Sequence, residues 1–366
     1  MQTLVEVPVA AVTASAYTIP TDGPESDGTL EWDTTTIVVV EAQAGDHSGL
    51  GYTYGHAAAA RVIEETLAPL VEGADATAPA ALWERLGAAL RNAGRPGIGM
   101  TAVSAVDIAL WDMKARLLGV SLASLLGGGG EPLPVYGSGG FTSYSLDRLR
   151  EQLGGWVNDG IPRVKLKIGR EPERDPPRLD AAREAVGPET ELYVDANGAF
   201  TAKQALDWAG RLALQWGVAW FEEPVSSADL ESLRLVRERA PAGLEVAAGE
   251  YGYVLRDFVN LVGAVDCLQA DVTRCGGISG LIAVGGLATA HGLDLSAHTA
   301  PAVSTHAFAA VSGVRHLEWF HDHVRVERLL FDGTLEPEGG ALRPDRTRPG
   351  LGLELRRPDA ERWRVA

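Results

Sequence analysis

From residue 134 onward, short apolar runs alternate with longer stretches of mixed polarity. The apolar runs occupy 134–139, 163–169, 191–198, 218–224, 244–250, 267–273, 294–299 and 316–320. The seven stretches between them are amphipathic or rich in Ala and Leu, and each is long enough for a helix. Short strands separated by helix-length spacers are typical of β/α units, and eight in succession favour a closed barrel over an open sheet. The pattern therefore predicts an α/β barrel.

A doubly wound open sheet is the structural alternative. Such folds carry a G-x-G-x-x-G turn between a strand and a helix. The nearest match here, Gly137-Ser138-Gly139-Gly140, lacks the third glycine. It is better interpreted as a tight turn after the first strand, so the barrel is preferred.

The segments on either side of the barrel have a different pattern. Residues 1–125 combine strand-like runs such as 36–40 with a helical apolar spacing over 100–118, which predicts an α+β capping domain. Four glycines at 127–130 break the pattern, because so flexible a run does not fit inside a helix or strand. We expect a barrel over 126–325 and a polar C-terminal segment, 326–366, that returns to the head.

Composition narrows the function. The formal net charge of −17 argues against a nucleic-acid partner, which needs a basic surface. No apolar run approaches the ~20 residues of a membrane span, and the first residues lack a secretory signal, so we expect a cytoplasmic protein without a membrane partner. The two cysteines, Cys267 and Cys275, are interpreted as small buried side chains.

Three acids end successive strand-like runs. Asp195, Glu222 and Glu250 follow one another at intervals of about one β/α unit. Strand ends converge at one mouth of a barrel, where three carboxylates repel each other unless a cation binds, and all-oxygen ligation suits Mg²⁺ or Mn²⁺. Glu223 competes with Glu222, since neighbours on a strand face opposite ways, and we expect Glu223 to face the helices.

Basic residues accompany the acids. Lys165 and Lys167 share one face of their strand, and their mutual repulsion is expected to bring one lysine's pKa toward roughly 7 to 8, where it can accept a proton. His298 and Asp271 end two later runs, and a carboxylate beside imidazole fixes its tautomer and raises its basicity. Glu318, on the last run, is expected either to donate a hydrogen bond to substrate when protonated or to form a salt bridge.

These residues, in this order, resemble the enolase superfamily, specifically its mandelate racemase subgroup. The resemblance rests on K-x-K, VDANG, WFEEP, AAGE, QADVTRCGG and the later histidine. It implies a modified TIM barrel, (β/α)7β, and an N-terminal capping domain completed by the C-terminal tail. It also implies Mg²⁺ held by Asp195, Glu222 and Glu250.

The resemblance further implies roles for the other residues. Lys167 would be one acid/base and the His298–Asp271 dyad the opposite one, while Lys165 would bind the substrate carboxylate. Asn197 would touch a substrate hydroxyl. Substrate-selecting loops of the cap would correspond to residues 21–32 and 49–56, which contribute Trp32 and Tyr54.

The predicted chemistry is removal of the proton next to a carboxylate, through an ene-diolate. Dehydration of a sugar acid to a 2-keto-3-deoxy acid is the first hypothesis, and racemisation or epimerisation of a 2-hydroxy or amino acid is the alternative. Asp271 replaces the lysine of muconate-lactonizing and dipeptide-epimerase relatives, which disfavours their chemistry. A non-catalytic, metal-stabilised binding protein is a third hypothesis. The family resemblance implies a homo-oligomer.

One further motif suggests metal binding. His321 and His323 alternate just past the last strand and resemble a second metal pair. Short motifs of this kind more often make solvated or salt-bridged contacts, so we do not expect a second metal there.

Overall fold

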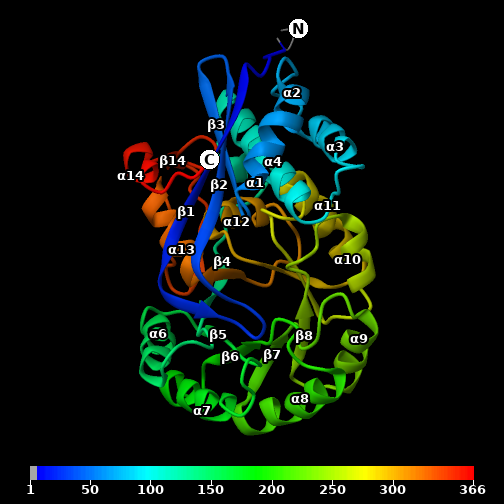
Figure 1. The fold of residues 1–366 in the computed structure, drawn as a ribbon, viewed down its shortest axis with the longest axis vertical. Coiled ribbons are helices and arrows are strands. Elements are labelled where there is room, and N and C mark those ends of the chain that lie inside the picture. The colour runs from blue at the N-terminus through cyan, green and yellow to red at the C-terminus, as the bar shows by residue number, and fades with distance from the viewer. Residues whose placement is uncertain (1–5) are drawn as a thin grey trace.

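Eight parallel strands form a barrel in the computed structural model, which describes residues 6–366 (Figure 1). The strands are β4 (Leu133–Gly139), β5 (Arg163–Lys167), β6 (Glu191–Asp195), β7 (Val218–Glu222), β8 (Glu245–Ala248), β9 (Cys267–Ala270), β10 (Asp294–Ala297) and β11 (Leu317–Phe320). Consecutive strands from β4 to β10 pair in parallel, and β11 pairs with β4. The ring closes where the amide of Ala297 donates to the carbonyl of His316 at 3.0 Å.

Seven helices connect these strands. They are α6 (Leu146–Asn158), α7 (Asp175–Val186), α8 (Ala202–Trp216), α9 (Leu230–Arg239), α10 (Leu255–Leu261), α11 (Gly277–Ala290) and α12 (Pro301–Phe308). Local sequence sets their limits: α8 begins at a capping box made by Thr201 and Gln204, and it ends at Gly217 with φ +60°. The (β/α)7β barrel expected from the sequence is confirmed.

Aromatic rings fill the middle of the barrel. Tyr136, Tyr193 and Trp220 point inward from β4, β6 and β7, and the ring of His316 packs against all three. Such inward layers make the barrel a packed core rather than a pore. Functional side chains are therefore confined to the rim above this layer.

The N-terminal unit covers one end of the barrel. An antiparallel sheet of β1 (Ala11–Ser26), β2 (Glu31–Ala44) and β3 (His47–Tyr54) packs on α4 (Ile98–Leu117). The shorter helical pieces are α1 (Ala58–Val62), the π-helical turn Ile63–Leu67, α2 (Ala68–Val71), α3 (Pro79–Ala89) and α5 (Leu122–Leu125). Gly51 allows the close sheet–helix contact, because a Cβ there would lie 2.2 Å from the carbonyl oxygen of Ala105.

The C-terminal segment returns to this unit, as predicted. After α13 (His321–Leu330) come the short strands β12 (Phe331–Asp332), β13 (Ala341–Leu342) and β14 (Glu354–Leu355), followed by α14 (Arg357–Glu361). The amide of Thr18 in β1 then donates to the carbonyl of Trp363 at 2.9 Å. The proposed boundaries at 125 and 325 stay predictions. No helix within residues 6–366 combines the length and apolarity needed to cross a membrane.

A buried acid between α4 and α11 gives a prediction for stability. Asp107 accepts hydrogen bonds from the amide and the hydroxyl of Ser279 at 2.9 and 2.7 Å, and burial raises its pKa to about 7. Between pH 4 and 7 the folded chain therefore holds a proton that the unfolded chain has lost. Its unfolding free energy falls as pH rises, by up to about 1.4 kcal/mol per pH unit.

Replacing Asp107 by asparagine should remove this dependence. Melting temperatures of the Asp107→Asn variant and the parent protein, recorded from pH 4 to 8, should converge at low pH and separate toward neutral pH, with the variant more stable. Parallel curves would show that Asp107 is ionised throughout.

Candidate active site

The predicted functional residues meet at the carboxyl ends of the barrel strands. Lys165 and Lys167 lie on β5, and Glu318 on β11, whereas Asp195 and Glu222 end β6 and β7. Glu250, Asp271 and His298 follow β8, β9 and β10 within two residues. The placement inferred from the strand pattern is confirmed.

Backbone strain marks the same rim. Within residues 6–366, four non-glycine residues have positive φ: Asn197 at +46°, Glu223 at +37°, Thr299 at +47° and Ala300 at +46°. Each follows the end of a rim strand. Residues held in the left-handed region cost free energy and cluster at functional sites, so their gathering here supports the rim as the active site.

Asp195, Glu222 and Glu250 could hold a metal ion. Each offers a carboxylate oxygen, these oxygens lie within 4.8 Å of one another, and all three residues are buried. Burial, followed by the charge of Asp195, raises the pKa of Glu222 to about 8. Three buried carboxylates that repel one another and converge in this way fit a hard divalent cation such as Mg²⁺.

The two lysines lie against this cluster. Nζ of Lys165 is 2.6 Å from Glu222 and 2.9 Å from Glu318, and Nζ of Lys167 is 2.5 Å from Asp195. Burial alone would lower the pKa of each lysine, but the neighbouring carboxylates outweigh it and hold both pKa values above the usual range. This arrangement contradicts the expected lowering of a lysine pKa toward 7 to 8, which considered lysine–lysine repulsion without the adjacent acids.

His298 and Asp271 form the predicted dyad. Nδ1 of His298 lies 2.8 Å from Oδ2 of Asp271, and Nε2 lies 3.1 Å from Oε2 of Glu250. Both ring nitrogens of His298 therefore face a carboxylate. Burial disfavours the imidazolium, but Glu250 and the bond to Asp271 raise the pKa of His298 to about 10.

Two residues beside the dyad were missed in the sequence. The amide and hydroxyl of Thr273 both donate to Oδ1 of Asp271 at 2.7 Å. Nε of Arg274 lies 3.3 Å from Oδ2 of Asp271, and Nη1 donates to the carbonyl of Glu250 at 3.2 Å. Thr273 and Arg274 follow Asp271 by two and three positions, so their closeness in the sequence was a signal for their contact with Asp271.

Glu318 forms the salt bridge that was one of its two expected roles. Burial favours the neutral acid, but the ammonium group of Lys165 dominates, and the pKa of Glu318 falls to about 2. Its Oε2 also accepts the amide of Thr299 at 3.0 Å. The hydrogen-bond donor role is therefore not supported: Glu318 is ionised and neutralises Lys165.

Glu223 is a further correction. It was expected to face the helices, by alternation with Glu222. It follows the end of β7 in the left-handed conformation, so strand alternation no longer applies. Burial and then the charges of Glu250 and Asp195 hold its pKa well above the usual range, which places Glu223 among the site acids.

A cavity of about 430 Å³ opens above these residues. Lys167, His298, Glu250 and Arg274 line it from the barrel, and Asn197 lines it from the loop after β6. The cap contributes Trp32 and Tyr54, as predicted, together with Thr34, Thr35 and Thr36. Asp322 and His323 line it from the start of α13.

The cap segments differ in form from the expected loops. Residues 49–54 belong to strand β3, so only the last two residues of the 49–56 segment leave the sheet. The 21–32 segment forms the end of the β1–β2 hairpin, which reaches down to the barrel in Figure 1. Gly28, at its tip, packs so closely that a Cβ would lie 2.1 Å from the carbonyl oxygen of Ala196.

His321 and His323 do not form a metal pair. The His323 ring stacks on Tyr54 with centroids 3.4 Å apart. His321 instead pairs with Asp22 at 3.0 Å, and a ligand set of Asp22, Glu25 and His321 is geometrically possible. Arg148 pairs with Asp22 at 2.7 Å, and its positive charge disfavours a cation at the same carboxylate.

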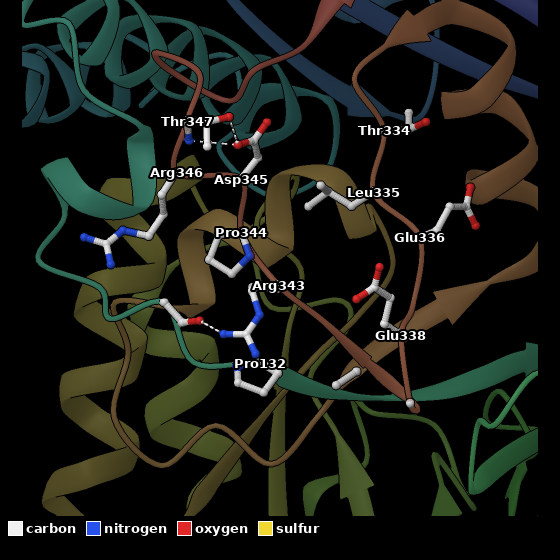
Figure 2. A pocket seen from close by; sticks show the side chains of 13 residues that line it. Pro132, Thr334, Leu335, Glu336, Glu338, Arg343, Pro344, Asp345, Arg346 and Thr347 are labelled. Atoms are coloured by element: carbon white, nitrogen blue, oxygen red, sulfur yellow. Dashed lines mark hydrogen bonds between the residues drawn. The ribbon is translucent and has the colours of Figure 1, made fainter.

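A larger hollow, of about 730 Å³, lies along the C-terminal segment (Figure 2). It is lined by residues such as Glu336, Arg343 and Asp345, and by none of the predicted site residues. The Asp345 carboxylate already accepts from Thr347. Size therefore does not identify the active site, whereas the convergence of acids and bases does.

A barrel whose rim carries a carboxylate triad between two proton carriers, closed by an α+β cap, defines a class of enzymes. Residues 148–360 match the family model described as "Enolase C-terminal domain-like", and residues 15–127 match "Mandelate racemase / muconate lactonizing enzyme, N-terminal domain". The chain belongs to the enolase superfamily, in its mandelate racemase subgroup.

Similar proteins agree with this assignment. A mandelate racemase/muconate lactonizing enzyme-like protein from Rubrobacter xylanophilus is 61% identical, with a TM-score of 0.97 over 98% of this chain and 100% of that one. A racemase from Streptomyces coelicolor, solved with bound magnesium, is 30% identical, with a TM-score of 0.91 over 98% and 100%. Arabinonate dehydratase from Saccharolobus solfataricus is 34% identical over 87% of this chain and 88% of its own length.

Proposed function

We propose that this protein dehydrates a sugar acid to a 2-keto-3-deoxy acid, using a divalent cation, with Mg²⁺ as the best fit. The observation that carries the proposal is that Lys167 and His298 line one cavity together with a carboxylate triad. Sequence relatives named as dehydratases, among them the arabinonate dehydratase, support the choice of dehydration.

Each residue has a proposed part in the reaction. Asp195, Glu222 and Glu250 would hold the cation, which supplies positive charge beside the substrate carboxylate and makes the neighbouring hydrogen more acidic. Lys165 would add positive charge at the same carboxylate, and Asn197 would bind a substrate hydroxyl.

Proton transfers complete the scheme. Lys167, in its neutral form, takes the proton from the carbon next to the carboxylate. His298, oriented by Asp271, gives a proton to the departing β-hydroxyl, which leaves as water, and the resulting enol rearranges to the keto acid. A binding protein would not need these two proton carriers, because neither holds the metal; this favours an enzyme over the non-catalytic hypothesis.

Incubation with Mg²⁺ and a panel of sugar acids in deuterated water tests the proposal. A dehydratase forms a 2-keto-3-deoxy acid, detected by a carbonyl reagent, with deuterium incorporated at C3. Deuterium exchange next to the carboxylate without keto product would contradict dehydration.

Deuterium exchange without keto product would instead support racemisation or epimerisation, a reaction that needs the same two bases. If Lys167 removes a proton from one face and His298 returns one to the other, the carbon inverts without losing water. The racemase among the structural neighbours makes this the second candidate.

Location and assembly are also proposals. Two free, buried cysteines, Cys267 and Cys275, suit a reducing compartment such as the cytoplasm. A homo-oligomer is proposed from the family resemblance, and its molar mass by light scattering would test it.

A further inference from the structure

The two ends of the cavity differ in charge. At the barrel end, Lys167 and Arg274 lie beside the proposed metal ligands. The cap and the start of α13 supply the rest of the lining, which is called the cap end. Of the described residues lining it there, none is a lysine or arginine; the charged ones are Asp27, Glu31 and Asp322.

The arginines nearest this end are already engaged from outside the cavity. Arg325 donates to Oδ1 of Asp322 at 2.8 Å, and Arg170 pairs with Glu31 at 2.8 Å. Neither arginine lines the cavity. Their positive charge is paired with Asp322 and Glu31, which line the cavity, whereas the two arginines do not.

Polar neutral groups supply the rest of this end. Thr34, Thr35 and Thr36 line the cavity, and the hydroxyl of Thr35 donates to Oδ2 of Asp322. Behind them, Glu25 is fully buried and accepts a bond from Nε1 of Trp32 at 2.9 Å. Burial, and then the charge of Asp322, raises the pKa of Glu25 to about 8.

A ligand carboxylate at this end would face Asp27, Glu31 and Asp322 and would find no lysine or arginine among the described lining residues to pair with. Placing like charges close together without a paired cation costs free energy. A hydroxyl group avoids this cost, because it can donate to a carboxylate and accept from a threonine.

We propose that the substrate carries one carboxylate, held at the barrel end, and a neutral polyhydroxyl chain at the cap end. The ligand class is thus aldonic acids, with aldaric acids excluded by the second carboxylate. This inference rests on the proposed function for the orientation of the ligand.

Paired ligands that differ only at the far end test the proposal. Galactonate and galactarate share their stereocentres, and other aldonate–aldarate pairs extend the comparison. With Mg²⁺ present, titration calorimetry should show that the protein binds each aldonate at least about tenfold more tightly than the matching aldarate. The values of kcat/KM should favour the aldonate as well. Tighter binding of the aldarate would overturn the proposal, whether or not either acid is turned over.

The binding comparison also separates this inference from the proposed function. Aldonate binding with proton exchange but no keto product would refute dehydration and leave the ligand class standing. Keto product formed mainly from aldarates would support dehydration and refute the proposed ligand class. Binding of neither acid at millimolar concentration would refute both.

A charge added at the cap end should reverse the preference. Thr34 is exposed and lines the cavity, so Thr34→Arg places a guanidinium there without disturbing the core. It should improve aldarate affinity relative to aldonate at least fivefold. Asp33→Asn is the matched control: it makes the same change in net charge at an exposed neighbour outside the cavity lining, and it should leave the ratio unchanged. Equal shifts in both variants would show a general charge effect and contradict the proposal.

Discussion

Replacing Lys167 by alanine should lower turnover and deuterium exchange by about 10²- to 10⁴-fold, the usual contribution of a positioned acid or base. Its Nζ lies 2.5 Å from Asp195 and lines the cavity, and no other lysine lines that cavity among the described residues. The measurement is single-substrate kinetics together with NMR detection of exchange in deuterated water. Retention of more than about a tenth of the exchange rate would contradict a role as base.

Stability must be measured alongside, because Lys167 also neutralises a buried acid. Without metal, Lys167→Ala removes the closest partner of Asp195 and should lower the melting temperature. With saturating Mg²⁺, the cation should compensate, and most of the loss should disappear. Lys203→Ala is the matched control: Lys203 is exposed on α8, and its removal should change neither activity nor stability.

The fold was predictable because a barrel strand leaves a strong local signal. Each strand is a short apolar run bounded by polar residues, and all eight predicted runs overlap a strand of the barrel. The cap was predicted less well. Its long β1–β2 hairpin is half exposed and contains residues typical of turns, so it lacks the continuous apolar run that marks a barrel strand. Residues 49–54 contain two glycines and thus suggest a loop, yet they form β3, because their small side chains let the strand approach α4.

The site was predictable in position but less so in electrostatics. Strand ends fix where Asp195 and His298 lie, because every parallel strand delivers its end to the same rim. The pKa values depend instead on atoms from several elements at once. Lys165 contacts acids from β7 and β11, and Glu318 is ionised for that reason. The spacing of these residues in the sequence does not reveal the distances among side chains that come from three different strands.

Removing the divalent cation should abolish turnover and leave the fold intact. The three acids of the triad do not stand alone without metal: Lys165 contacts Glu222 at 2.6 Å and Asp195 at 3.6 Å, and Lys167 contacts Asp195. These ammonium groups offset much of the repulsion. Protein dialysed against a chelator should therefore keep its circular dichroism spectrum, lose activity, and regain it when Mg²⁺ is added.

Glu250 differs from the other two acids of the triad in its neighbours. Lys165 and Lys167 pair with Asp195 and Glu222, whereas Oε2 of Glu250 faces Nε2 of His298 at 3.1 Å. Glu250→Gln keeps the size and removes the charge, and it should weaken Mn²⁺ binding, followed by electron paramagnetic resonance, at least about tenfold. Glu238→Gln, at an exposed position on α9, is the control and should bind like the parent. Unchanged affinity in Glu250→Gln would mean that the cation sits elsewhere, and the roles assigned around it would fall with it.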